Sequence, residues 1–196
     1  MLKVGITGGI GSGKSIAARV FERLLVPVFY ADTEAKALYT ESLEVKRKII
    51  KLLGKESYLP SGEPNRQVIA SKIFNNEELL HKVNQIIHPA VAENFNFFCY
   101  LHSKKKPYVI KEAAILFESN AHKDLDYTIC VDAPEDIRIK RVMQRDKVTE
   151  EDVRQRIKNQ WPAEKKAALA DFVVLNDGKT MLLPQIIRLH EQFNEK

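Results

Sequence analysis

The chain has 196 residues, and its 31 lysines and arginines outnumber its 26 aspartates and glutamates, giving a net charge of +5. Hydrophobic residues make up 44% and charged residues 29% of the chain, which excludes a disordered protein and is typical of a folded domain. No apolar run reaches the ~18 residues that a membrane helix needs, and we expect no signal peptide.

The excess positive charge is concentrated in one segment. Residues 138–158 hold eight basic and four acidic side chains, so most of the net charge lies there. Such a segment indicates a polyanionic partner, whether a nucleic acid, a membrane surface or a phosphorylated small molecule. The two cysteines, Cys99 and Cys130, match no paired motif, so we expect unpaired thiols and a cytoplasmic location.

The predicted elements alternate between strands and helices. Apolar runs predict strands at 2–7, 27–30, 107–111, 126–132 and 171–176. Apolar residues at helical spacing predict helices at 15–25, 32–53, 66–74, 77–101 and 179–193, with a break or kink at Pro89. Residues 54–66 are a predicted loop, and Thr149 followed by Asp152 predicts a capped helix start. The alternation predicts a parallel sheet with helices on both faces.

Eight consecutive residues near the N-terminus carry the strongest functional signal. They match G-x-x-x-x-G-K-[ST] between a predicted strand and a predicted helix, and they are Gly8, Gly9, Ile10, Gly11, Ser12, Gly13, Lys14 and Ser15. Glycines let backbone N–H groups converge on phosphate oxygens, and the helix N-terminus favours the same anion. We expect Lys14 to reach the β- and γ-phosphates and the Ser15 hydroxyl to bind Mg²⁺. The motif predicts a protein that binds a nucleoside triphosphate.

The reaction class follows from what else the chain contains. It lacks the N-K-x-D signature of a GTPase and is too short for a large motor ATPase, so a small ATP-dependent phosphotransferase is favoured. Asp32 follows the second predicted strand, at the sheet edge where the phosphate loop also lies, and can accept the proton of an attacking hydroxyl. The alternative role for Asp32 is a helix N-cap.

Other charged residues have two interpretations each. Glu112 and Asp132 both follow predicted strands, and we favour Glu112 as the acid that helps to hold Mg²⁺, although either could be a capping residue. Arg138, Arg141 and Arg145 share one helix face, which is either a solvated surface or a lid that stabilises the charge on the transferring phosphoryl group.

Taken in chain order, the motifs resemble those of the dephospho-CoA kinase family over nearly the whole chain. The matching residues are 7–15, Ala31–Asp32, Arg66, Phe74, His88–Pro89, 116–118, 140–146, Thr149–Glu150, Arg156–Ile157, Gln160, Ala170–Asp171 and Asn176. Two positions depart from the family pattern. Tyr30 stands where the family has the first acid of D-A-D, and Ala113–Ala114 stands where a proline commonly precedes L-L-F-E.

The resemblance implies ATP-dependent phosphorylation of the 3′-hydroxyl of the dephospho-CoA ribose, the final step of coenzyme A biosynthesis, on a fold similar to nucleoside monophosphate kinases. It makes Asp32 the base and puts the acceptor near Arg66, His88 and the residues Leu116, Phe117 and Glu118. It also makes Arg141 the favoured lid arginine, with Arg145 beside it, and puts Asn176 near adenine.

We therefore predict one α/β domain over residues 1–196, a three-layer P-loop NTPase fold. Its core comprises 1–32, 106–137 and 163–196, its helical acceptor subdomain 33–105 and its small helical lid 138–162. The expected partners are ATP with Mg²⁺ and dephospho-CoA, with no nucleic acid, membrane or obligate protein partner. The alternatives are a kinase of another hydroxyl acceptor, such as shikimate or a nucleotide, and a nucleotide-dependent nucleic-acid-binding protein, which lacks a recognition pattern here.

Overall fold

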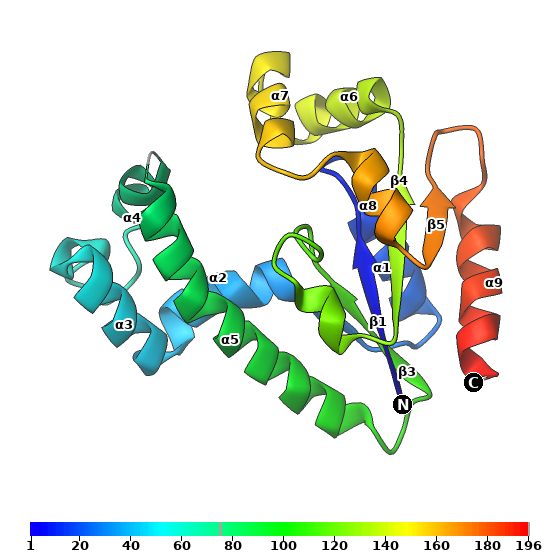
Figure 1. The fold of residues 1–196 in the computed structure, drawn as a ribbon, viewed down its shortest axis with the longest axis horizontal. Helices are drawn as coiled ribbons and strands as arrows, with labels where there is room; N and C mark the ends of the chain where they lie inside the picture. Colours follow the sequence, from blue (N-terminus) through cyan, green and yellow to red (C-terminus); the bar gives the residue numbers. More distant parts are fainter. Residues whose placement is uncertain (75, 196) are drawn as a thin grey trace. The chain divides into compact units, whose positions relative to one another are not determined.

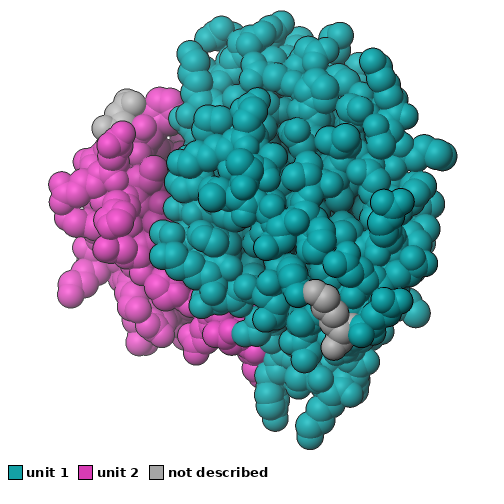
Figure 2. All heavy atoms as spheres, turned by 45° about the vertical axis from the view of Figure 1, so that its right-hand side comes forward, with its two compact units in different colours: residues 1–30, 98–196 teal, residues 31–97 magenta. Residues whose placement is uncertain are grey.

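The computed structural model describes residues 1–74 and 76–195. Contacts divide the chain into two compact units, coloured separately in Figure 2. Unit 1 comprises Met1–Tyr30 with Phe98–Lys196 and carries the sheet, whereas unit 2, Ala31–Phe97, is helical. No helix in the described part of the chain is both long and apolar enough to cross a membrane.

A parallel sheet forms the centre of unit 1, as predicted. In the described residues its strands are β1 (Leu2–Thr7), β2 (Val28–Tyr30), β3 (Tyr108–Glu112), β4 (Tyr127–Asp132) and β5 (Phe172–Leu175). They pair in the order β2-β3-β1-β4-β5, which makes β1 the central strand (Figure 1). Val4 of β1 lies opposite Ile110 of β3 and Tyr127 of β4. Because β1 is central, the loop that follows it emerges from the middle of the sheet edge.

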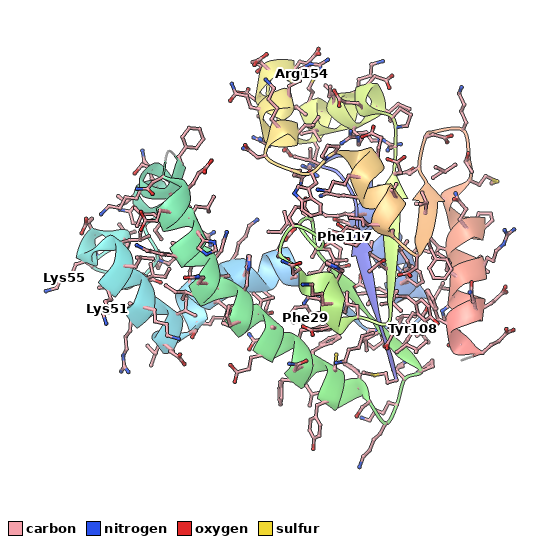
Figure 3. The ribbon with its side chains drawn as sticks, viewed as in Figure 1. Phe29, Lys51, Lys55, Tyr108, Phe117 and Arg154 are labelled. Carbon is pink, nitrogen blue, oxygen red and sulfur yellow. The ribbon has the colours of Figure 1, made fainter. Side chains whose placement is uncertain are left out.

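Two helices cover one face of this sheet and enclose the main core. They are α1 (Lys14–Arg23) and α9 (Leu182–Asn194), which pack on each other and on the strands. The alternation of side chains along each strand sends every second residue into this core. Its buried members include Val4, Ile6, Phe21, Tyr108, Ile110, Ile129, Val174, Ile186 and Phe193. Figure 3 labels Tyr108, whose ring meets Phe193 at a centroid distance of 5.3 Å.

The opposite face of the sheet contacts the loop that follows β3. Gly5 presents no side chain there, and a Cβ at this position would lie 2.7 Å from a methyl of Leu116 and 2.6 Å from one of Leu125. The short helix α8 (Ala163–Leu169) packs against β4, and a 3₁₀ turn covers Ala121–Asp124. The absence of a side chain at Gly5 therefore lets the post-β3 loop lie close against the central strand.

The basic segment forms two helices with a small core of their own. They are α6 (Glu135–Asp146) and α7 (Glu150–Lys158), joined through the buried side chains of Ile139, Val142 and Val153. The predicted cap of α7 is confirmed, because Thr149 and Asp152 exchange side-chain and backbone hydrogen bonds reciprocally.

Unit 2 contains α2 (Ala31–Glu41), α3 (Leu43–Leu53), a 3₁₀ turn (Lys55–Ser57), α4 (Arg66–Phe74) and most of α5 (Glu77–His102). The single helix predicted at 32–53 is wrong: Ser42 interrupts it and caps α3 by accepting a hydrogen bond from the Val45 N–H. Asp32 follows β2, which ends at Tyr30 as predicted, and it lies in the first turn of α2.

Of the break or kink predicted at Pro89, the break is absent, since α5 continues through the proline. Proline has no N–H to bond the carbonyl four residues earlier, so the helix loses one internal hydrogen bond there. Buried side chains on both sides of the proline, including Ile87, Val91 and Phe95, hold the helix in place through packing.

Candidate active site

The phosphate loop forms the sharp turn that its glycines predict. Gly11 and Gly13 have φ angles of +79° and +98°, which residues other than glycine rarely adopt. A Cβ at Gly13 would collide with the amide nitrogen of Asn176. Ser12 is 1% exposed, and its hydroxyl has no hydrogen-bond partner in the described part of the chain. A tight glycine turn with an unpartnered buried hydroxyl fits a phosphate group.

A buried carboxylate joins the two polar residues that end this loop. Glu112, 3% exposed at the carboxyl end of β3, has its Oε1 2.9 Å from the Lys14 Nζ. The Ser15 hydroxyl donates a 2.9 Å hydrogen bond to the same oxygen. Of the two acids considered from the sequence, Glu112 is therefore shown to contact both residues. A hydroxyl beside a carboxylate is an oxygen donor set that fits Mg²⁺, which is usually held by one or two carboxylates together with substrate phosphates.

Tyr30 lies next to this carboxylate across the sheet, at the position where the family pattern has an acid. It is paired in register with Glu112. Burial, followed by a hydrogen bond to Glu22, raises the pKa of the Tyr30 phenol above its ordinary value. The side chain is therefore neutral at pH 7, and the substitution adds no negative charge beside Glu112.

Asn176 and Arg141 border the other side of the phosphate loop. Asn176 follows β5, and its side-chain N–H donates a 2.7 Å hydrogen bond to the Ser12 carbonyl. Its amide oxygen lies 3.5 Å from a guanidinium nitrogen of Arg141. The other terminal nitrogen, Nη1 of Arg141, is buried without a hydrogen-bond partner among the described residues. This spare donor fits an anionic ligand.

The three arginines of α6 have different surroundings although they share a helix face. Arg138 is buried, its Nε donates to the Ala133 carbonyl at 3.0 Å, and its guanidinium occupies the space where a Cβ of Gly9 would lie. Arg145 is exposed and forms an ion pair with Asp146, 2.7 Å from Nε to Oδ1. Arg138 therefore supports the loop backbone, whereas the end of α6 faces solvent.

The loop after β3 holds three residues expected near the acceptor. The side chains of Leu116 and Phe117 are buried, with exposures of 0% and 2%. Glu118 is bound within the protein: its Oε1 lies 2.6 Å from Nζ of Lys166 and accepts a 3.1 Å hydrogen bond from the Trp161 N–H. The other oxygen, Oε2, has no partner in the part of the chain that the structure describes. Lys166 was not identified from the sequence, because a lysine in a short helix with other charged residues is expected to be exposed to solvent.

The remaining expected acceptor residues belong to unit 2. Asp32 is half-buried in α2, Arg66 is exposed at the first position of α4, and His88 is half-buried in α5. The positive charge of Arg66 reaches Tyr39, where it opposes the rise in pKa that burial causes. The phosphate loop, Glu112 and Arg141 belong to unit 1.

Comparison with known proteins decides the family. A family model described as "Dephospho-CoA kinase" matches residues 2–181. The chain belongs to the dephospho-CoA kinase family. The dephospho-CoA kinase of Chlorobium chlorochromatii (strain CaD3) is 42% identical over 197 residues, covering 97% of this chain and 93% of that protein. The resemblance found in the sequence motifs is thereby confirmed.

Solved structures agree with this dephospho-CoA kinase assignment at the level of the fold. TT1252 from Thermus thermophilus has a TM-score of 0.85 and 28% identity, covering 97% of this chain and 96% of that chain. A dephospho-CoA kinase from Campylobacter jejuni has a TM-score of 0.72 and 24% identity, covering 98% and 97%. The predicted P-loop kinase fold is confirmed. The chain is a phosphotransferase that uses ATP, with dephospho-CoA kinase activity, the final step of CoA biosynthesis.

Proposed function

We propose that this kinase transfers the γ-phosphoryl group of ATP to the 3′-hydroxyl of the dephospho-CoA ribose, with Asp32 as the general base. The observation that carries the proposal is the contact of one buried carboxylate, Glu112, with both Lys14 and Ser15 at the end of the phosphate loop. This arrangement supports phosphoryl transfer because the reaction depends mainly on positioning and on charge stabilisation around the phosphates.

The nucleotide side of the site uses residues of unit 1. Gly8 to Ser15 form the loop that holds the phosphates, partly through backbone N–H groups, and Lys14 and Arg141 balance the phosphate charge. Ser15 and Glu112 hold Mg²⁺, which supplies further neutralisation of the phosphate oxygens when it is bound. Asn176, fixed to the Ser12 carbonyl, contacts the adenine side of the nucleotide.

The acceptor side uses Asp32, Arg66, His88 and the loop Leu116–Glu118. Asp32 takes the proton of the 3′-hydroxyl as that oxygen attacks. Arg66 supplies positive charge that binds the phosphates of dephospho-CoA. Leu116 and Phe117 act through packing that fixes the loop, because their side chains are buried, and Glu118 offers Oε2 as an acceptor.

In this proposal the lid is the segment 138–162. The core comprises 1–32, 106–137 and 163–196, and the acceptor subdomain comprises 33–105. Arg141 and Arg145 bring positive charge to the triphosphate, and closure keeps water from competing with the acceptor. The buried, unpaired thiols Cys99 and Cys130 support a cytoplasmic location, because cysteines stay reduced there.

Asp32→Asn tests the base assignment. The variant should bind ATP with unchanged affinity, since the nucleotide side is intact, and lose turnover by roughly 10²- to 10⁴-fold. Steady-state kinetics with dephospho-CoA and titration with a fluorescent ATP analogue measure the two effects. Asp136→Asn, an exposed carboxylate on α6, is the control and should keep parental turnover. Parental turnover in Asp32→Asn would show that another group takes the proton.

A further inference from the structure

The segment that connects α7 to α8 contacts the phosphate loop through one side chain. Oε1 of Gln160 accepts a hydrogen bond from the Ile10 backbone N–H at 2.9 Å, although the two residues are 150 positions apart in sequence. Ile10 stands between Gly9 and Gly11, in the part of the loop with the greatest backbone freedom. Its side chain packs against the small core of α6 and α7, so both its backbone and its side chain contact the lid segment.

The peptide group between Gly9 and Ile10 is bound at both ends. Its carbonyl oxygen accepts from the Ser12 N–H at 3.0 Å, and its N–H donates to Gln160. A glycine permits such a peptide plane to rotate, which would exchange the directions of the carbonyl and the N–H. With Gln160 in place the plane has one orientation, and a carbonyl dipole is kept from turning toward the phosphates.

Gln160 is itself held from two sides. Its backbone N–H donates to the Ile157 carbonyl at 3.0 Å, at the end of α7. The next residue, Trp161, donates its N–H to Glu118, whose Oε1 also binds the buried Lys166. A side chain on a backbone fixed in this way loses little further freedom when it binds Ile10.

The chemistry of glutamine suits this position. Its amide oxygen is a neutral acceptor, so it can hold the Ile10 N–H without adding negative charge beside a triphosphate. A carboxylate of the same length would accept the same hydrogen bond but repel the nucleotide. An aliphatic side chain would leave the N–H without a partner in the partly buried loop.

We infer that Gln160 is a positioning residue of the phosphate loop, which fixes the Gly9–Ile10 peptide in the orientation that keeps the Gly9 carbonyl away from the phosphates of ATP. The inference rests on the proposed binding of those phosphates by Gly8 to Ser15, and it is independent of the role of Asp32. It gives the lid segment a second function, because the same stretch of chain that carries the arginines also shapes the loop beneath them.

The test compares Gln160→Leu with Gln155→Leu, which removes an exposed glutamine from α7 as a matched control. Gln160→Leu should weaken binding of a fluorescent ATP analogue and raise KM for ATP by roughly 5- to 100-fold, because a partly buried donor is left unpaired. KM for dephospho-CoA should stay within about 2-fold, because the change acts only on the loop. Gln155→Leu should resemble the parent in both constants.

A second variant and a direct measurement separate positioning from general stability. Hydrogen exchange should show that the Ile10 amide is protected in the parent and in Gln160→Glu, which keeps the acceptor oxygen, and loses protection in Gln160→Leu. Gln160→Glu should nevertheless bind the ATP analogue more weakly than the parent because of its charge. An unprotected Ile10 amide in the parent overturns the inference. So does parental nucleotide affinity in Gln160→Leu, or an equal rise of both KM values. If Gln160→Leu does not fold, hydrogen exchange of the Ile10 amide in the parent and in Gln160→Glu tests the inference.

Discussion

Lys166, whose side chain is wholly buried, holds its ammonium nitrogen 2.6 Å from Oε1 of Glu118. The same nitrogen donates a 2.8 Å hydrogen bond to the carbonyl of Ala114. The pair therefore fastens α8 to the loop that follows β3, and it does so inside the protein, where an unpaired charge is costly. The two-alanine departure from the family pattern lies in this loop, where the backbone carbonyl of Ala114 accepts the hydrogen bond from the lysine.

Lys166→Met should destabilise the protein strongly. The methionine fills similar space but leaves the carboxylate of Glu118 without its cation, which costs about 3–5 kcal/mol for a buried pair. Urea unfolding followed by circular dichroism measures the loss, and the exposed Lys140→Met should stay within about 0.5 kcal/mol of the parent. The double variant Lys166→Met/Glu118→Gln should recover part of the loss, because it no longer buries a lone charge. Additive effects would show that the two side chains do not interact.

Arg141→Met should slow phosphoryl transfer more than it weakens nucleotide binding. Removing an arginine that stabilises transition-state charge costs roughly 10³-fold or more in kcat. Arg141→Lys should restore little activity, because a lysine does not reproduce the planar donor geometry. Steady-state kinetics over a series of ATP concentrations give kcat and KM for each variant, with Arg154→Met on α7 as the control. Arg154, labelled in Figure 3, pairs with Glu135 and Glu150 on the exposed side of the lid helices. If kcat of Arg154→Met falls as far as kcat of Arg141→Met, the loss reflects a general effect on the lid.

Glu112→Gln should shift the Mg²⁺ dependence of the reaction. The amide cannot supply the negative charge that a divalent cation prefers, and it also releases Lys14 from its ion pair. We expect the Mg²⁺ concentration for half-maximal rate to rise by roughly 10-fold or more, the scale seen when groups supporting a metal site are removed. Rates measured over a Mg²⁺ series at fixed ATP provide the value. Asp132→Asn, the alternative considered from the sequence, should leave the Mg²⁺ midpoint unchanged. A shift in Asp132→Asn alone would reverse the assignment.

Stability should fall in the alkaline range through Cys130. Burial, followed by the nearby charge of Asp132, raises the pKa of this thiol from 9.0 to about 12. Between these two values the folded state retains a proton that the unfolded state releases, so stability decreases as pH rises, by about 1.4 kcal/mol per pH unit for one group. Urea unfolding between pH 7 and 10.5 should show a steeper decline for the parent than for Cys130→Ala. Parallel declines would show that the thiol titrates alike in both states.

Local sequence patterns were sufficient for much of the fold and for the phosphate loop. Glycine spacing around Lys14, the capping pair Thr149 and Asp152, and the alternation of the strands all act over a few residues, so the sequence displays them directly. Two predictions about helix continuity missed a competing effect. Ser42 ended a helix that the apolar pattern would continue, because its side chain caps α3 locally. No helix break occurs at Pro89, where buried neighbours hold the helix through packing.

Pairings between distant residues were harder to predict. Lys165 and Lys166 are adjacent and chemically identical, yet one is exposed over the Trp161 ring and the other is wholly buried beside Glu118. Choosing between Glu112 and Asp132 as the acid near Mg²⁺ required knowing which carboxylate lies close to Lys14 and Ser15 at the start of α1. Both acids end strands that flank β1, so only the three-dimensional structure shows that Glu112 contacts Lys14 and Ser15.

The central position of β1 has a consequence for how the protein is made. Leu2 pairs with Tyr108 and Thr7 with Cys130, so β1 leaves the ribosome well before the two strands that flank it. Contacts this distant in sequence form slowly because a long loop must close first. The phosphate loop, although synthesised before the flanking strands, therefore gains their support late. Capture of ATP by a growing chain would therefore signal that the middle of the sheet has already assembled.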